Sequence, residues 1–237
     1  MTPKNQPRPY PGGKGKAYPH VINLMPPHST YIETHLGAGA VMRNKRPAAR
    51  NMGIEIDPAV IHRWKKCDDH GFELIQGDAA KILPALDITQ DTLVYCDPPY
   101  VPDTRRRARV YRHDYDEDDH ERLLAVLSAI PARIILSGYP SDLYDRLLEG
   151  WSVTELTVQT HVGPVKEYLW TNYTPGPVLH DYSFVGIDFR EREAVRRRLR
   201  TVCTKLGRAQ EVERRAAFDR LANSHPQEFL QAAERIR

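Results

Sequence analysis

A short apolar segment that ends in an acid and two prolines constrains this chain more than any other feature. Residues 93–96, Leu-Val-Tyr-Cys, run directly into Asp97-Pro98-Pro99-Tyr100. A short apolar run predicts a buried strand of a parallel sheet, and the prolines end it because they have no N–H to donate. Ligands of open α/β sheets bind beyond the carboxyl ends of strands, so we expect Asp97 at a functional site.

The residues from Asp97 to Tyr100 have the chemistry to hold an amino group. The carboxylate of Asp97 and the carbonyls of Asp97 and Pro98 accept hydrogen bonds, and Tyr100 adds a flat face. Acceptors that converge on one amine beside an aromatic ring suit the exocyclic amine of a nucleobase, where stacking contributes about 1–3 kcal/mol. The alternative is a strand-ending turn with a chance tyrosine, and the rest of the sequence must decide.

A glycine loop and an acid precede this segment at a spacing typical of nucleoside-binding α/β proteins. Residues 30–33 read as a strand that leads into a loop with Gly37 and Gly39. The next strand-like run, residues 51–56, ends at Asp57, where an acid suits a ribose diol. The loop and the acid together favour an adenosine-containing ligand.

In chain order these motifs resemble those of the Dam-like DNA adenine methyltransferases. Asp97-Pro98-Pro99-Tyr100 matches the catalytic motif of the amino-group methyltransferases, Asp/Asn/Ser-Pro-Pro-aromatic. Glu33, Gly37 and Gly39 match the pattern E-P-F-x-G-x-G, in which Thr34-His35 here replaces Pro-Phe. The catalytic residues that the resemblance implies are Asp97, Pro98, Pro99 and Tyr100.

The start of the chain resembles the family as well. Residues 9–16 are similar to the opening W-x-G-G-K, with Tyr10 in the place of the tryptophan and Lys14 as the lysine. Asp78 corresponds to an acid near the donor adenine in the family, although it can equally cap the helix that follows. The resemblance implies S-adenosylmethionine as methyl donor and no metal. The implied donor-binding residues are Tyr10, Gly13, Lys14, Glu33, His35, Gly37, Gly39, Asp57, Asp78 and Asp97.

The resemblance also implies the fold class, α/β of the Rossmann-like class I methyltransferase type. It has a mostly parallel seven-stranded sheet that ends in an antiparallel hairpin. Period-two runs at 152–161 and 165–173, joined by Gly163-Pro164, predict this hairpin. Residues 167–173 resemble the family too, and we interpret them as architecture. We expect a methyltransferase domain over residues 1–177 and a charged helical C-terminal extension over residues 178–237.

The sequence leaves no room for a separate recognition domain before the catalytic motif, so nucleic-acid contacts are predicted in other segments. Dam and its close relatives place that domain between the donor half and the catalytic motif, but only 18 residues separate Asp78 from Asp97 here. The polar segment 101–113 either grips phosphates around an extruded base or is a solvated loop. The sequence predicts two helices in the tail, over residues 188–206 and 210–223, and this helical tail either packs on the core or presents arginines to DNA. The candidate nucleic-acid-binding residues are Arg105, Arg106, Arg107, Arg109, Tyr111, Arg112, Arg196, Arg197 and Arg200.

Composition adds weaker constraints. The net charge is +3, and residues 188–237 carry 13 Arg/Lys against 8 Asp/Glu, which fits either a polyanion partner or a solvated helix face. The three cysteines form no C-x-x-C pair, so neither a disulfide framework nor a zinc site is indicated. No apolar run reaches membrane-spanning length and the N-terminus is not signal-like, so we expect a cytoplasmic protein of prokaryotic or phage type, associated with the nucleoid.

The expected function is site-specific DNA adenine methylation, with transfer of a methyl group from S-adenosylmethionine to the N6 amine of adenine. DNA with a flipped base is the expected partner, together with a cognate restriction enzyme, and a monomer without membrane contact is the expected state. Two alternatives stay open. One is methylation of an amine in RNA by the same motif, and the other is a catalytically silent nucleic-acid-binding module.

Overall fold

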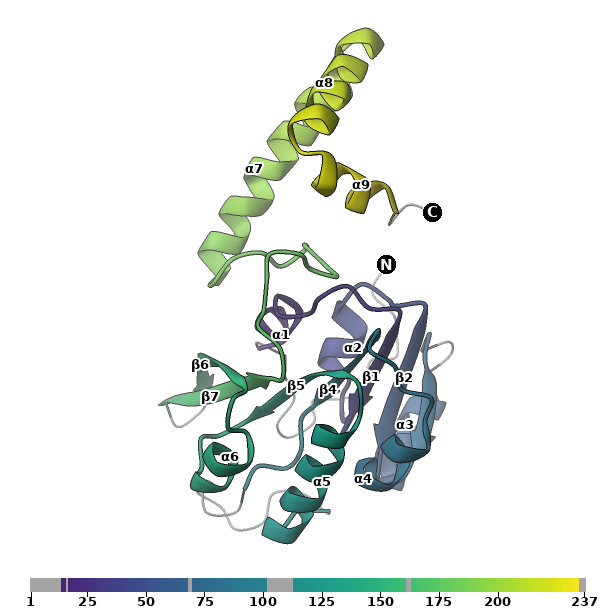
Figure 1. The fold of residues 1–237 in the computed structure, drawn as a ribbon, viewed down its shortest axis with the longest axis vertical. Coiled ribbons are helices and arrows are strands. Elements are labelled where there is room, and N and C mark those ends of the chain that lie inside the picture. The colour runs from purple at the N-terminus through teal and green to yellow at the C-terminus, as the bar shows by residue number, and fades with distance from the viewer. Residues whose placement is uncertain (1–13, 16, 68–69, 102–112, 161–162, 235–237) are drawn as a thin grey trace. The chain divides into compact units, whose positions relative to one another are not determined.

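The computed structural model describes residues 14–234 apart from residues 16, 68–69, 102–112 and 161–162 (Figure 1). The chain divides into two compact units, Met1–Phe184 and Val185–Arg237.

The first unit is built on a seven-stranded sheet with the order β3-β2-β1-β4-β5-β7-β6. The strands are β1 (Thr30–Thr34), β2 (Arg50–Glu55), β3 (Glu73–Gln76), β4 (Thr92–Cys96), β5 (Arg133–Gly138), β6 (Ser152–Thr160) and β7 (Gly163–Thr171). The first five run parallel, whereas β7 pairs antiparallel with both β5 and β6. This topology confirms the predicted Rossmann-like class I methyltransferase fold.

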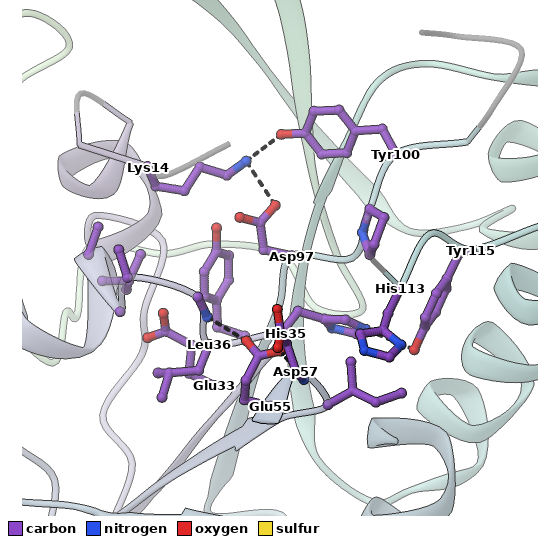
Figure 2. A pocket seen from close by; sticks show the side chains of 18 residues that line it. Lys14, Glu33, His35, Leu36, Glu55, Asp57, Asp97, Tyr100, His113 and Tyr115 are labelled. Atoms are coloured by element: carbon purple, nitrogen blue, oxygen red, sulfur yellow. Dashed lines mark hydrogen bonds and ion pairs between the residues drawn. The ribbon is translucent and has the colours of Figure 1, made fainter. Parts of the chain in front are cut away.

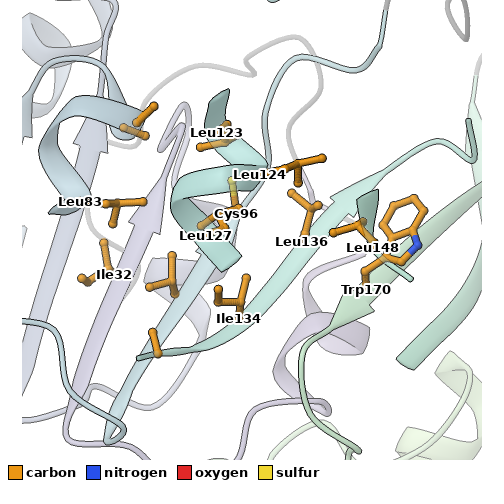
Figure 3. Close-up of a cluster of buried hydrophobic side chains, with 14 of the residues drawn as sticks. Ile32, Leu83, Cys96, Leu123, Leu124, Leu127, Ile134, Leu136, Leu148 and Trp170 are labelled. Carbon is orange, nitrogen blue, oxygen red and sulfur yellow. The ribbon is translucent and has the colours of Figure 1, made fainter. Parts of the chain in front are cut away.

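Helices cover both faces of the sheet (Figure 1). They are α1 (Tyr18–Ile22), α2 (Ala40–Asn44), α3 (Pro58–Lys65), α4 (Ala79–Ile82), the 3-10 turn η1 (Leu83–Ala85), α5 (Glu117–Ala129) and α6 (Asp142–Leu147). Side chains of α4, α5 and α6 belong to one buried cluster, shown in Figure 3, and those of α1, α2 and α3 belong to another. The sheet therefore has a hydrophobic core on each side.

Strand β4 contributes to both cores, as the apolar run predicted. Val94 and Cys96 belong to the cluster that packs on α5, and Leu93 and Tyr95 belong to the cluster on the opposite face. Successive side chains of a strand point to opposite faces, so a central strand must be apolar at every position. All of β4 is buried, and its burial fixes the place at which Asp97 leaves the sheet.

The segment after the hairpin packs with the first unit. Leu179 is buried, the N–H of His180 donates to Met25 O at 2.8 Å, and Asp181 Oδ2 accepts from the N–H of Arg46 at 2.9 Å. The first compact unit extends to Phe184. The predicted domain boundary at residue 177 stays a prediction.

The second unit consists of α7 (Phe189–Arg208), α8 (Glu211–Ser224) and α9 (Pro226–Glu234). The charge and apolar periodicity predicted the first two helices, whereas α9 was not predicted. None of the three contains a buried residue, and Leu199 and Val202 on the apolar face of α7 are both 54% exposed. Among the described helices, none combines the length and the apolar character needed to cross a membrane.

Candidate active site

A pocket lies at the carboxyl ends of β1, β2 and β4 (Figure 2). These strands are neighbours and parallel, so the residues that follow them meet at one edge of the sheet. Most of the described residues predicted for the site line this pocket: Lys14, Glu33, His35, Gly37, Gly39, Asp57, Asp97, Pro99 and Tyr100. Glu55, Tyr95, His113 and Tyr115 line it as well and were not predicted.

The glycine loop after β1 forms one wall of the pocket. Gly37 and Gly39 have φ values of 49° and 59°, in the left-handed region where glycine carries no steric cost. The indole N–H of Trp64 donates to Gly37 O at 2.9 Å and ties the loop to α3. A β-carbon on Gly39 would lie 2.8 Å from Trp64 Cζ2. The loop therefore needs glycine for its conformation and for its contact with the helix.

Glu55 organises the floor of the pocket, and sequence reasoning missed it. Its carboxylate accepts hydrogen bonds from the N–H of Gly37 at 2.8 Å and from that of Asp57 at 2.9 Å. The sequence prediction took Asp57 as the acid at the strand end, but β2 ends at Glu55, and Asp57 caps α3 through Ala59 N at 2.8 Å. Burial raises the pKa of Glu55 above its usual range. A signal was available, because Glu55 is an acid that directly follows the apolar residues Met52, Gly53 and Ile54 of the same strand.

Asp97 belongs to a buried cluster of charged and hydroxyl groups. Lys14 Nζ lies 2.8 Å from Asp97 Oδ1 and 2.7 Å from Glu167 Oε1, and it also contacts the hydroxyl of Tyr100. The Tyr100 hydroxyl donates to Glu167 Oε1 at 2.9 Å, and Ser137 Oγ donates to Asp97 Oδ1 at 2.8 Å. Lys14 and Glu167 are almost fully buried, with exposed side-chain fractions of 7% and 6%, whereas that of Asp97 is 19%.

The cluster holds its charges by mutual attraction. Burial alone would lower the pKa of Lys14, but the carboxylates of Asp97 and Glu167 outweigh it and place that pKa well above its ordinary value. Burial raises the pKa of Asp97, and Lys14 opposes this shift. Glu167, on β7, was not predicted as a site residue, because the hairpin was interpreted as architecture and nothing in its local sequence pairs it with Asp97.

His35 forms an aromatic wall of the pocket. Its Nε2 lies 2.9 Å from the hydroxyl of Tyr115, its Nδ1 lies 3.0 Å from Thr34 Oγ1, and its backbone φ is 55°. Burial, and after it the neighbouring His120, lowers the pKa of His35 to about 3, so the ring is neutral at ordinary pH. A neutral flat ring therefore stands where the family pattern has phenylalanine.

Asp78 and Pro98 do not line the pocket. Asp78 caps α4 by accepting from the N–H of Ala80 at 3.0 Å, and its Oδ2 lies 3.7 Å from Arg122. Its part in donor binding stays a prediction. Within the described residues, no group of three or more His, Cys, Asp or Glu side chains has the arrangement of a metal site. The following predicted residues lie outside the described ones: Tyr10, Gly13, Arg105, Arg106, Arg107, Arg109, Tyr111 and Arg112.

Three solved structures illustrate what the chain is similar to in shape. Precorrin 8W decarboxylase from Methanobacterium thermoautotrophicum is 13% identical, with 70% of this chain and 94% of that chain covered and a TM-score of 0.48. An S-adenosylmethionine-dependent methyltransferase from Archaeoglobus fulgidus is 11% identical, with 68% of this chain and 95% of that chain covered and a TM-score of 0.48. Magnesium protoporphyrin IX methyltransferase from Synechocystis is 16% identical, with 62% of this chain and 71% of that chain covered and a TM-score of 0.44. A search of the curated proteins found none that matches this chain.

Residues 61–162 match the model of the D12 class N6 adenine-specific DNA methyltransferases. The matched segment contains Asp97-Pro98-Pro99-Tyr100, the motif on which the resemblance depends. The match confirms the predicted resemblance to the adenine-specific DNA methyltransferases and supports an S-adenosylmethionine-dependent methyltransferase.

Proposed function

We propose that this protein transfers a methyl group from S-adenosylmethionine to the exocyclic N6 amine of adenine in DNA. The observation that supports this most is the placement of the Asp97 carboxylate. Lys14 and Ser137 both bind Oδ1, whereas no hydrogen bond or ion pair among the described residues involves Oδ2. The carboxylate is therefore held in a fixed orientation and keeps one oxygen for a substrate N–H.

The pocket suits the methyl donor. Gly37 and Gly39 line the pocket without a side chain, so a ligand can approach their main chain closely. Asp57 and Glu55 supply acceptors for a ribose diol, and neutral His35 supplies a flat face. When bound, S-adenosylmethionine supplies the methyl group on a positively charged sulfur.

The residues after β4 act on the amine. Asp97 Oδ2 accepts one N6–H, which orients the nitrogen lone pair toward the methyl group. The new N–C bond forms as the S–C bond breaks, and the surplus proton of the amine leaves to Asp97 or solvent. The Tyr100 ring stacks on the base, which must first leave the duplex at a cost of a few kcal/mol.

We propose that α7 contributes phosphate contacts. Arg197 and Arg200 are exposed on this helix, and no acid among the described residues pairs with either of them. Arg196 differs, because it forms an ion pair with Glu193.

The expected restriction-enzyme partner, the monomeric state and the cytoplasmic, nucleoid-associated location stay predictions.

The test is methyl incorporation from labelled S-adenosylmethionine into duplex DNA, single-stranded DNA and RNA, compared side by side. We expect label in DNA, recovered as N6-methyladenine, and its loss in Asp97→Ala. Calorimetry with the donor shows whether the variants keep a folded pocket. Label in RNA alone would replace the acceptor, and donor binding without transfer to any acceptor would favour the catalytically silent module.

A further inference from the structure

One ammonium group serves two carboxylates in the active site, and only one of the two belongs to the catalytic motif. Lys14 Nζ lies 2.8 Å from Asp97 Oδ1 and 2.7 Å from Glu167 Oε1. Strand β7, which carries Glu167, is separated from β4 by β5. The lysine thus joins the motif after β4 to a strand two positions away in the sheet.

Tyr100 connects the same two parts of the site. Its hydroxyl donates to Glu167 Oε1 at 2.9 Å and is also contacted by Lys14, and its ring lies against that of Tyr139, with centroids 4.3 Å apart. The phenol is therefore fixed at both its polar end and its face. A carboxylate at residue 167 holds the ring and the lysine with a single oxygen, Oε1.

We propose that Glu167 is a positioning residue for methyl transfer, an inference that rests on the proposed function. By binding Lys14 and the Tyr100 hydroxyl together, it sets the acceptor carboxylate of Asp97 and the stacking ring in one arrangement. It does not touch the substrate. It acts through Lys14, Asp97 and Tyr100.

The charges give this arrangement a second effect. Two carboxylates share one ammonium, so one negative charge is unbalanced beside the amine that becomes positive during transfer. Without the charge of Glu167, Lys14 would pair with Asp97 alone and make it a weaker acceptor. Burial raises the pKa of Asp97 most, Lys14 lowers it, and Glu167 raises it. The described titratable groups that act on Asp97 are Lys14, Glu33, Tyr95, Cys96, Tyr100 and Glu167.

A purely structural role makes a different prediction. Glu167 is buried on a strand of the terminal hairpin, and its loss could simply loosen that hairpin. Such an effect lowers the Tm but leaves the pH dependence of the remaining activity unchanged. A change in the pH profile therefore separates the two roles.

The test compares Glu167→Gln, which keeps the shape and loses the charge, with Glu167→Ala, which loses both. Glu155→Gln is the matched control, because Glu155 lies on the partner strand β6, pairs with Lys166 at 3.0 Å and is 45% exposed. Each variant is measured for Tm, donor affinity by calorimetry, kcat and acceptor KM on DNA, and kcat against pH.

We expect Glu167→Gln to lower kcat by about tenfold and to change donor affinity less. The acid limb of its pH profile, where kcat falls as the pH decreases, should move to lower pH. Glu167→Ala should in addition raise acceptor KM, because Tyr100 loses its anchor. A folded Glu167→Gln with kcat within twofold of wild type, or with reduced kcat and an unmoved acid limb, would overturn the inference. Failure of the wild-type protein to methylate DNA would instead overturn the proposed function.

Discussion

The backbone of Gly39 lies against the indole of Trp64, so close that a β-carbon at residue 39 would stand 2.8 Å from Cζ2. The same indole donates its N–H to Gly37 O at 2.9 Å. Helix α3 therefore fixes the glycine loop through one side chain, by steric fit at one residue and by a hydrogen bond at the other. The shape of the pocket depends on both contacts.

Gly39→Ala should destabilise this loop and weaken donor binding. The substitution forces a side chain into the left-handed region, at φ 59°, and against Trp64, and backbone strain of this kind costs about 1–3 kcal/mol. Gly71→Ala is the control, because Gly71 has φ 73° and open space around its β-carbon. Donor affinity by calorimetry and Tm by circular dichroism check the prediction. Equal losses in the two variants would show that the contact with Trp64 contributes nothing.

Glu33 should make the stability of the protein depend on pH. Burial raises its pKa from 4.5 to about 8, although the hydrogen bond from the Tyr31 hydroxyl opposes the shift. Between these two pH values the folded state binds the proton that the unfolded state has lost, so stability falls as the pH rises. The free energy of unfolding decreases by about 1.4 kcal/mol for each pH unit within this range.

Glu33→Gln should remove this dependence. Its Tm relative to wild type should therefore increase from pH 5 to pH 8, as measured by thermal unfolding at several pH values. Glu149→Gln, at an exposed position outside the pocket, is the control. A difference in Tm that stays constant across the range would contradict the linkage argument.

Tyr100 should act on the acceptor through its ring and on the site through its hydroxyl. Tyr100→Ala removes the stacking face, worth about 1–3 kcal/mol, and should raise acceptor KM about tenfold or more with little change in donor affinity. Tyr100→Phe keeps the ring and loses the bond to Glu167, so we expect a smaller change in acceptor KM. Steady-state kinetics on DNA distinguish them, and identical KM values in the two variants would refute the stacking role.

The arginines of α7 should contribute to DNA affinity through charge alone. Replacing Arg197 and Arg200 together by Ala should weaken DNA binding at every sequence and reduce the salt slope of binding by about two, if each contacts one phosphate. Arg215→Ala on α8 is the control, since Arg215 already pairs with Glu211 at 2.8 Å. Fluorescence anisotropy over a range of salt concentrations measures the slope. An unchanged slope in the double variant would exclude α7 from the interface.

Local sequence was enough to predict most of the pocket. The apolar run before Asp97, the prolines that end it and the glycines of the first loop are all properties of neighbouring residues, and they predicted where each side chain leaves the sheet. The helix that starts after Asp78 was predicted for the same reason, because an N-cap acts on amides two residues away.

Tertiary structure decided which distant groups share the site. Glu167 and Tyr100 are 67 residues apart, and they meet because β7 returns antiparallel beside β5 at the edge of the parallel strands. The bridge that Lys14, near the start of the described chain, forms between Asp97 and Glu167 depends on the same packing of β7. No local pattern encodes such contacts, since they depend on strand order.

By itself, therefore, the sequence determined the strand that presents Asp97, the glycine loop and the resemblance to the family whose model residues 61–162 match. These depend on backbone preferences and hydrogen-bonding groups that act over a few residues. Only the tertiary structure decided that Glu55 holds the loop and that Lys14 and Glu167 surround the Asp97 carboxylate. The physical reason is that buried charges require partners, and the packing of the sheet determines which partners are within reach.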